Sequence, residues 1–152
     1  MTYTDKLKSL GIEIPAVPKP VAAYVPATQV GDYIFTSGQL PSIEGKLFAT
    51  GKLGAEVTEE IGYQAAKVSA INCLAAVQNL IGDLNRVEKI VKVVGFVNSA
   101  PGFTNQPKVI NGASELFGAI FGTAGEHARS AVGVSELPLN SPVEIEIIVK
   151  IK

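Results

Sequence analysis

The sequence predicts an α+β fold in which two helices cover one face of a mixed β-sheet. Apolar residues recur at helical spacing in residues 58–84 and 106–122, whereas apolar and polar residues alternate in residues 143–151. A β-branched run, residues 87–99, lies between the two helical stretches and is apolar on both faces, which is typical of a central, covered strand. The element order is therefore β-β-β-α-β-α-β-β, which a chain of 152 residues can build as one domain.

The first 20 residues are expected to be an N-terminal extension arm of this domain, which spans residues 1–152. They begin with a short helix that carries Leu7 and Leu10 on its apolar side and ends at Gly11. Prolines at positions 15, 18 and 20 exclude a helix there and favour an extended arm. Residues 21–41 then read as two strands that turn at Gly31-Asp32, and residues 42–54 add a loop, a short strand and a further turn.

Each long helix has an apolar face that is expected to pack on the sheet. Thr58 is the N-cap candidate of the first helix, and Glu59 and Glu60 favour the positive end of its dipole. The predicted buried face of this helix consists of Ile61, Ala65, Val68, Ile71 and Ala75. That of the second helix consists of Val109, Ala113, Leu116, Phe117, Ile120 and Phe121. Two helices leave one sheet face uncovered, so the apolar composition predicts that this face meets another copy of the chain in a closed assembly.

Composition argues against several classes of protein. Hydrophobic residues make up 47% of the chain and mean hydropathy is +0.29, yet no apolar run approaches the roughly 20 residues that cross a bilayer. The N-terminus lacks the apolar core of a signal peptide, so a cytoplasmic location is expected. The net charge is −1 and the 13 basic residues are scattered, which argues against nucleic acid as a partner.

Cys73 and His127 are the chain's single cysteine and single histidine. A lone thiol excludes an intrachain disulfide, and its small-residue surroundings favour a buried core position. One histidine and one cysteine cannot supply the ligands of a typical zinc site, and no Asp/Glu cluster suggests a carboxylate site, so no metal is expected. The pair also rules out a Cys-His or Ser-His triad beyond a single contact.

Two charged residues stand at strand entrances in the apolar C-terminal stretch. Arg129 begins one strand, and its planar fork matches a carboxylate through two parallel hydrogen bonds. Glu144 begins the next, and burial in a cleft would raise its pKa and make it a proton carrier near neutrality. Glu146 lies on the same side, so either carboxylate is a candidate. The structural alternatives are a salt bridge from Arg129, for instance to Glu144, and a solvated strand face for the carboxylates.

Four further residues have chemistry beyond packing. Ser37 offers a hydroxyl at a strand end, but without a paired base it is not expected to be a nucleophile. Gly38 permits a ligand to approach the backbone closely. Tyr24 and Asn111 present polar tips on apolar elements, and such tips are more often structural than functional.

Three stretches together resemble one family. "FTSGQLP", "VIN" followed by "ELF", and above all "ARSAVGVSELPLNSPVEIE" resemble the Rid (YjgF-like) family of reactive-intermediate imine/enamine deaminases, over most of the chain from about Val21 to the C-terminus. The resemblance implies a chorismate-mutase-like fold and a homotrimer with ligand clefts between neighbouring subunits. It also implies hydrolysis of 2-imino acids, which pyridoxal-phosphate enzymes such as threonine dehydratase release, to 2-keto acids and ammonia without a cofactor.

The resemblance also implies roles for single residues. Arg129 would clamp the substrate carboxylate, and Glu144 would position water and manage protons. The remaining substrate contacts would come from Tyr24, Ser37, Gly38, Asn111 and Ala131. Ala131 stands where many relatives have cysteine, which excludes a thiol role at that position.

The sequence departs from the family pattern in two further places. It reads "AAYVPA" where Gly-Pro-Tyr is common, and "GEHARS" where an aromatic residue and proline usually precede Ala-Arg-Ser. Two alternative functions therefore stay open. One is a non-catalytic protein that binds a ketoacid or another small carboxylate, and the other is an endoribonuclease or translation inhibitor.

Overall fold

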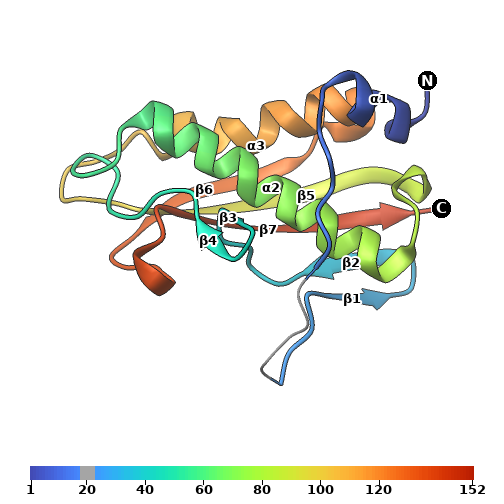
Figure 1. Cartoon of the computed structure of the whole chain (residues 1–152), viewed down its shortest axis with the longest axis horizontal. Helices are drawn as coiled ribbons and strands as arrows, with labels where there is room; N and C mark the ends of the chain where they lie inside the picture. The colour runs from blue at the N-terminus through green and yellow to red at the C-terminus, as the bar shows by residue number, and fades with distance from the viewer. Residues whose placement is uncertain (18–22) are drawn as a thin grey trace.

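The computed structural model describes residues 1–17 and 23–152, and its central feature is a five-stranded mixed sheet. The strands lie in the order β1-β2-β7-β5-β6, with β5 and β6 parallel and the other neighbours antiparallel. Their bounds are β1 Ala27–Val30, β2 Tyr33–Thr36, β5 Val87–Asn98, β6 Ala128–Val134 and β7 Val143–Ile151. Figure 1 shows helices α2 (Glu59–Ile81) and α3 (Gln106–Phe121) side by side over one face of this sheet. The predicted α+β class and the two-helix layer are confirmed.

Smaller elements complete the chain. Helix α1 (Tyr3–Ser9) packs near the end of α3, and a two-stranded ribbon is formed by β3 (Ser42–Ile43) and β4 (Lys46–Leu47). Short 3₁₀ turns are η1 (Leu84–Arg86), η2 (Gly122–Gly125) and η3 (Pro138–Asn140). The predicted positions of Pro18, Pro20 and the start of the first strand fall outside the described residues. Within the part of the chain that the structure describes, none of the helices has the length and apolar character that crossing a bilayer requires.

Local sequence signals set most of the element ends. The hydroxyl of Thr58 accepts a hydrogen bond from the N–H of Ile61 at 3.2 Å, as the predicted N-cap requires. The β1–β2 hairpin turns at Gly31-Asp32, where Gly31 adopts a φ of +58° that favours glycine. In α1 the prediction was half right, because Leu7 is buried whereas Leu10 is 42% exposed beyond the helix end.

The buried face of α3 matches the prediction, but that of α2 does not. All six apolar residues predicted for α3 are buried. In α2, Ala65 and Ala75 are buried, but Ile61 is exposed and Val68 and Ile71 are only partly buried. The residues that α2 buries are mostly small: Gly62, Ala65, Ala66, Ser69, Ala70, Cys73, Leu74, Ala75, Ala76 and Val77. The predicted stripe was therefore right only for Ala65 and Ala75, because α2 turns mainly its small residues to its neighbours.

Close contact between the two helices explains this choice. A Cβ atom added at Gly112 of α3 would lie 2.0 Å from the carbonyl oxygen of Tyr63 in α2. Such an approach of two backbones admits only small side chains at the crossing. Cys73, on the same small-residue face, is fully buried and donates from Sγ to the carbonyl of Ile145 at 3.2 Å. The prediction of a buried core thiol is confirmed, and burial raises the pKa of that thiol.

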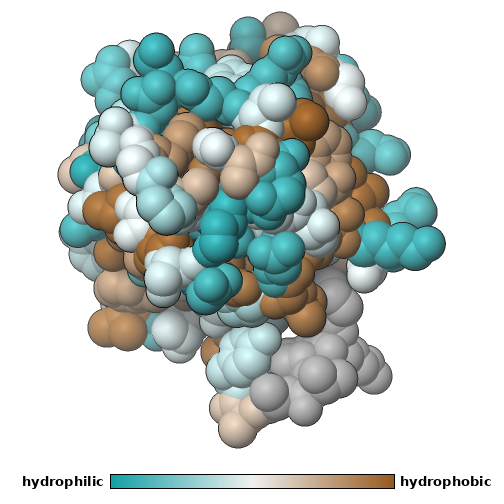
Figure 2. Space-filling model, turned by 90° about the vertical axis from the view of Figure 1, so that its left-hand side faces the viewer, coloured by the Kyte–Doolittle hydropathy of each residue, from teal (hydrophilic) through white to brown (hydrophobic). Residues whose placement is uncertain are grey.

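The second face of the sheet carries no helix. Strand β5 was predicted to be central. It is an interior strand, between β7 and the edge strand β6, and its residues Val87, Ile90, Val93 and Val97 are buried toward the helices. Its alternate residues, including Val94 and Phe96, stay partly exposed, so the expected cover on both faces is not present within one chain. Exposed apolar side chains on this open face are Val30, Tyr33, Phe35 and Val132. Viewed from the left-hand end of Figure 1, the surface mixes hydrophobic and hydrophilic side chains (Figure 2).

Substitution of Gly112 tests the helix crossing. We expect Gly112→Ala to lower the free energy of unfolding by at least about 2 kcal/mol, because the new methyl group collides with the Tyr63 backbone. Gly118→Ala is the matched control in the same helix, since Gly118 is exposed and its Cβ would meet no atom within 4 Å. That change should stabilise the protein by about 0.5–1 kcal/mol. Urea unfolding measures both, and equal stabilities for the two variants would contradict the crossing.

Candidate functional site

Arg129 lies between the sheet edge and helix α3. It is paired with Val93 of β5, whose side chain is buried toward the helices, so the Arg129 side chain points to the helix-covered face. Its Nη1 donates to Oδ1 of Asn111 at 2.8 Å and to Oγ of Ser114 at 3.2 Å. Asn111 and Ser114 are three residues apart on α3 and therefore present their side chains on one face of that helix. The structure brings Arg129 and Asn111 together, as the candidate site requires.

Two further residues extend this group. Oγ of Ser114 is 2.8 Å from Nε2 of His127, and Nδ1 of His127 is 2.6 Å from the carbonyl oxygen of Gly125. Ala131 follows Arg129 by two positions on β6, so its methyl group faces the same side of the sheet and packs against the core. Sequence reasoning did not single out Ser114. Its position about one helical turn after Asn111 is the signal that could have identified it.

Glu144 belongs to a second group on the other face of the sheet. It pairs with Phe96 and alternates with the buried Val143 and Ile145, so its side chain points to the open face. Burial, and secondarily the nearby charge of Glu146, raise the pKa of the Glu144 carboxyl above its ordinary value. The carboxylate is partly buried rather than fully solvated, and this partial burial is the condition that a proton carrier near neutrality needs.

Gly38 makes room for the Glu144 carboxylate. A Cβ atom at Gly38 would lie 2.8 Å from Cδ of Glu144 and 2.9 Å from its Oε1, which is closer than any real Cβ contact. Backbone hydrogen bonds in both directions between Gln39 and Ile145, at 2.7 and 3.0 Å, hold this loop against β7. The side chain of Glu144 can therefore lie against bare backbone only because residue 38 is glycine.

Ser37 begins the loop that contains Gly38, and Tyr24 lies in the segment before β1 to which Ser37 is hydrogen-bonded. The hydroxyl of Ser37 donates to the carbonyl of Val25 at 2.6 Å, and its N–H donates to the carbonyl of Pro26 at 2.8 Å. Its hydroxyl proton is therefore already in use, and its oxygen remains available as an acceptor. Tyr24 is 63% exposed, so its ring is free to contact a molecule outside the chain.

The Arg129 group and the Glu144 group do not meet within one chain. Strand β5 separates β6 from β7, which places the two strands about 10 Å apart. Arg129 is level with Val93 of β5 and Glu144 with Phe96, and the two side chains leave opposite faces of the sheet. One small acid therefore cannot contact both groups in a single chain.

The alternative that Arg129 forms a salt bridge with Glu144 is wrong for the single chain. Over residues 1–17 and 23–152, the salt bridges join Lys52 to Glu136 and Lys150 to Glu88. Arg129 instead contacts two neutral oxygen atoms and is partly buried. Its positive charge is thus held by hydrogen bonds and remains available to an anion.

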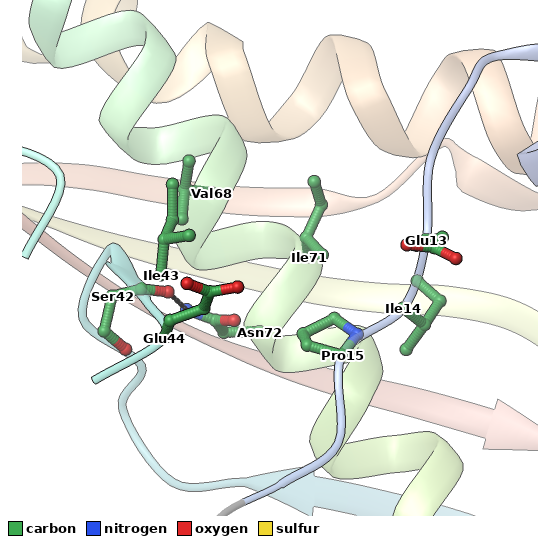
Figure 3. Close-up of a pocket in the computed structure, with 9 residues that line it drawn as sticks. All are labelled: Glu13, Ile14, Pro15, Ser42, Ile43, Glu44, Val68, Ile71 and Asn72. Carbon is green, nitrogen blue, oxygen red and sulfur yellow. Dashed lines mark hydrogen bonds between the residues drawn. The ribbon is translucent and has the colours of Figure 1, made fainter. Parts of the chain in front are cut away.

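A groove of about 480 Å³ lies elsewhere on the molecule, over the outer face of α2 (Figure 3). It is lined by Glu13, Ile14, Pro15, Ser42, Ile43, Glu44, Val68, Ile71 and Asn72. Both hydrogen bonds from Nδ2 of Asn72 go to the backbone, to the carbonyls of Leu40 and Ser42 at 3.0 Å each. Because the groove includes none of the candidate residues, it is separate from the site, although Asn72 anchors the segment that follows Gly38.

Fold and site together define a class of protein: an α+β chain of chorismate-mutase-like architecture with a polar group on each face of its sheet. The chain belongs to the YjgF/chorismate mutase-like family. The model of that family, described as "YjgF/chorismate_mutase-like, putative endoribonuclease", matches residues 4–151.

Several known proteins are similar along nearly their whole length. Protein TCP17 of Trypanosoma cruzi is 42% identical over 95% of this chain and 91% of its own. A 2-iminobutanoate/2-iminopropanoate deaminase of Dermatophagoides farinae is 31% identical over 93% and 95%. The crystal structure of a "putative endoribonuclease" from Shewanella oneidensis superposes with a TM-score of 0.95 at 34% identity, covering 99% of this chain and 100% of that one. TdcF of Escherichia coli with bound serine gives a TM-score of 0.64 at 25% identity, over 89% and 93%.

The raised pKa of Glu144 predicts how stability depends on pH. The folded chain keeps the Glu144 proton to a higher pH than the unfolded chain, so the free energy of unfolding falls as pH rises between the ordinary and the raised pKa. Glutamine carries no charge and escapes this cost. We therefore expect Glu144→Gln to be more stable than the wild type at pH 7, and the difference to shrink below the ordinary pKa of glutamate. Urea unfolding at several pH values measures it, and a destabilised Glu144→Gln at pH 7 would contradict the desolvation of this carboxyl.

Proposed function

We propose that this protein hydrolyses reactive 2-imino or enamine acids to 2-keto acids and ammonia, in clefts between subunits of a homotrimer. The observation that carries the proposal is the division of the candidate residues into two groups on opposite faces of one sheet. Each group supplies half of what the reaction needs, and a neighbouring copy of the chain supplies the other half. Cytoplasmic pyridoxal-phosphate enzymes that release such imines would provide the substrate.

The Arg129 group is suited to hold the substrate's carboxylate. Both hydrogens of Nη1 are directed to Asn111 and Ser114, which leaves the Nε–H and Nη2 edge of the guanidinium. That edge can form two parallel, charge-assisted hydrogen bonds to the two oxygens of one carboxylate. Asn111 and the methyl group of Ala131 would form the walls beside the bound acid.

The Glu144 group is suited to move protons. In the proposed reaction a water oxygen adds to the carbon of the C=N bond, and the carboxylate of Glu144 takes the proton that this water loses. The same carboxyl gives this proton to nitrogen, which completes the carbinolamine. It then carries the hydroxyl proton to nitrogen in the same way, so that the C–N bond breaks, ammonia leaves and the C=O bond of the keto acid forms. General acid–base help of this kind typically contributes 10²–10⁴-fold, which is adequate because imines already hydrolyse in water. A raised pKa allows Glu144 to act in both directions near neutrality.

The open face of the sheet supports assembly from several copies. Exposed apolar side chains such as Tyr33, Phe35 and Val132 lie on the same face as Glu144. Packing this face on a neighbouring subunit would bury them and bring Glu144 toward that neighbour's Arg129. Tyr24 and Ser37 would then line the same cleft. The deaminase of Dermatophagoides farinae and TdcF with its bound serine, a small amino acid with a carboxylate, are in keeping with this substrate class.

Two alternatives are separated from the proposal by simple observations. A binding protein for small carboxylates would use the same Arg129 group but would not turn over the imine. An endoribonuclease, which the family description also names, would have to work with scattered lysines and with a single histidine whose two ring nitrogens are both engaged. The protein's own residues therefore favour deamination over RNA cleavage.

Replacement of Arg129 tests the carboxylate clamp. A dehydratase generates 2-iminobutanoate, and the decay of the imine is followed with and without this protein. We expect Arg129→Ala to lower kcat/KM about 100-fold or more, and Arg129→Lys to recover little of it, because an ammonium lacks the planar fork. Arg86→Ala is the control, since Arg86 is exposed and is the chain's other arginine. If wild type and Arg129→Ala leave the decay equally slow, the protein is not a deaminase of this type.

Mixing two inactive variants tests the shared cleft. Arg129→Ala and Glu144→Gln chains are each expected to be inactive, but an intersubunit site takes its arginine from one chain and its carboxylate from the next. Unfolding and refolding the two variants together in equal amounts should restore about one quarter of wild-type activity, because one interface in four then holds both intact residues. A mixture with no more activity than its components would place both residues in separate sites. The activity of Glu146→Gln alone, compared with that of Glu144→Gln, identifies which of the two carboxylates takes part in the reaction.

A further inference from the structure

The side chain of Arg129 ends a continuous chain of hydrogen bonds. The chain runs from the Gly125 carbonyl to Nδ1 of His127 (2.6 Å), from Nε2 of His127 to Oγ of Ser114 (2.8 Å), and from Oγ of Ser114 to Nη1 of Arg129 (3.2 Å). Three elements contribute, because Ser114 lies on α3, Gly125 on η2, and His127 directly before β6. These contacts lie on the side of the guanidinium that faces the protein.

The Gly125 carbonyl at one end of this series of hydrogen bonds fixes which group donates in each of the others. A backbone carbonyl can only accept, so Nδ1 of His127 must carry a hydrogen. In the neutral ring Nε2 is then an acceptor, and the hydroxyl of Ser114 donates to it. The oxygen of Ser114 consequently turns its lone pairs to Arg129, whose Nη1 donates to it. With a neutral ring, these donor and acceptor roles satisfy every group in the series.

The histidine ring itself is held by the core. His127 meets the fully buried ring of Phe117 edge to face, with ring centroids 6.0 Å apart and an interplanar angle of 89°. Phe117 is on the same helix as Ser114, one turn further along. The orientation of the imidazole is thus set by packing on one side and by the Gly125 carbonyl on the other.

We infer that Ser114 and His127 are positioning residues, which hold the Arg129 guanidinium with its Nε–H and Nη2 edge turned to the carboxylate of a bound acid. An arginine side chain on an edge strand has many rotamers, and ordering it at the moment of binding weakens affinity. In this protein the side chain of Arg129 is already ordered in the folded state, so ligand binding does not have to order it. The inference rests on the proposed function for the identity of the ligand. It adds Ser114, which contacts Arg129, and His127, which contacts Ser114.

A pair of amide substitutions at position 127 tests this role. Glutamine can place its amide oxygen where Nε2 of histidine lies and so accept from Ser114, whereas asparagine reaches only the position of Nδ1. We expect His127→Gln to bind 2-oxobutanoate, the product, within about threefold of wild type. His127→Asn and Ser114→Ala should bind it about tenfold more weakly, with KM raised similarly and kcat changed less than about threefold. Calorimetric titration gives the dissociation constant, and the imine decay assay gives KM and kcat.

Other outcomes would overturn the inference. Equal affinities for the glutamine, asparagine and wild-type proteins would show that Arg129 needs no support from His127 through Ser114. A glutamine variant as weak as the asparagine variant would show that the contact with Ser114 is not the cause of the weaker binding. A merely structural role would lower kcat through loss of folded protein and leave the dissociation constant unchanged. Wild-type protein that binds 2-oxobutanoate without hydrolysing imines would refute the deaminase proposal and leave the affinity comparison decisive. Binding that Arg129→Ala does not weaken would overturn the positioning role itself.

The single histidine also allows a direct measurement. Nitrogen-15 spectra of His127 in the wild-type protein should show a neutral ring protonated at Nδ1 and accepting at Nε2. The chain has two arginines, so the Nε–H signal of Arg129 can be read beside that of Arg86 as an internal reference. We expect the Arg129 signal to broaden or shift in His127→Asn but not in His127→Gln. A ring protonated at Nε2 alone would contradict the proposed donor and acceptor roles in the hydrogen bonds from Gly125 to Arg129.

Discussion

A β-strand sends successive side chains to opposite faces of its sheet, and this alternation governs the candidate site. Along β6 it turns Arg129 toward α3, and along β7 it turns Glu144 to the open face, with the width of β5 between them. Because one face of the sheet is covered by helices and the other is not, the two charges meet different surroundings. A fold of this kind can present a cation and an anion close to each other in sequence without letting them neutralise one another.

The surroundings of the Arg129 and Glu144 side chains therefore differ. The guanidinium receives two neutral acceptors, Asn111 and Ser114, which orient it without cancelling its charge. The Glu144 carboxyl receives partial burial and a like-charged neighbour, so its pKa is raised and its ionised form is disfavoured. Neither arrangement is what packing alone would select, since an uncharged pair would fill the same space with less cost. Charges kept apart and unneutralised in this way are typical of sites that bind or transform a ligand.

The support behind Arg129 is where this chain differs from the family motif that it resembles. The residues before Ala-Arg-Ser are Glu-His, and the histidine contacts Ser114 of α3 and the carbonyl of Gly125. The arginine is the residue that would touch a ligand, but helix α3 supplies the side chains that fix its direction. Helix α3 is itself set by its close contact with α2 at Gly112, so the position of the guanidinium depends on the packing of the helix layer.

The sequence by itself determined the order of the five sheet strands and the two long helices, the N-cap at Thr58, the hairpin turn at Gly31-Asp32 and the buried stripe of α3, because each depends on local backbone preference or on the spacing of bulky apolar residues. It predicted one short strand in residues 42–54, where the structure has the two-stranded β3–β4 ribbon. It also pointed to Arg129, Glu144, Gly38 and Asn111, since a charged or amide side chain stands out on an apolar strand or helix, as does a glycine just after a strand end. Only the tertiary structure decided which face of α2 is buried, because the close approach of two backbones favours small residues over bulky ones. Only the tertiary structure joined Ser114 and His127 to Arg129 and separated Glu144 from it, because those relations arise from the pairing of strands and helices that are distant in the chain.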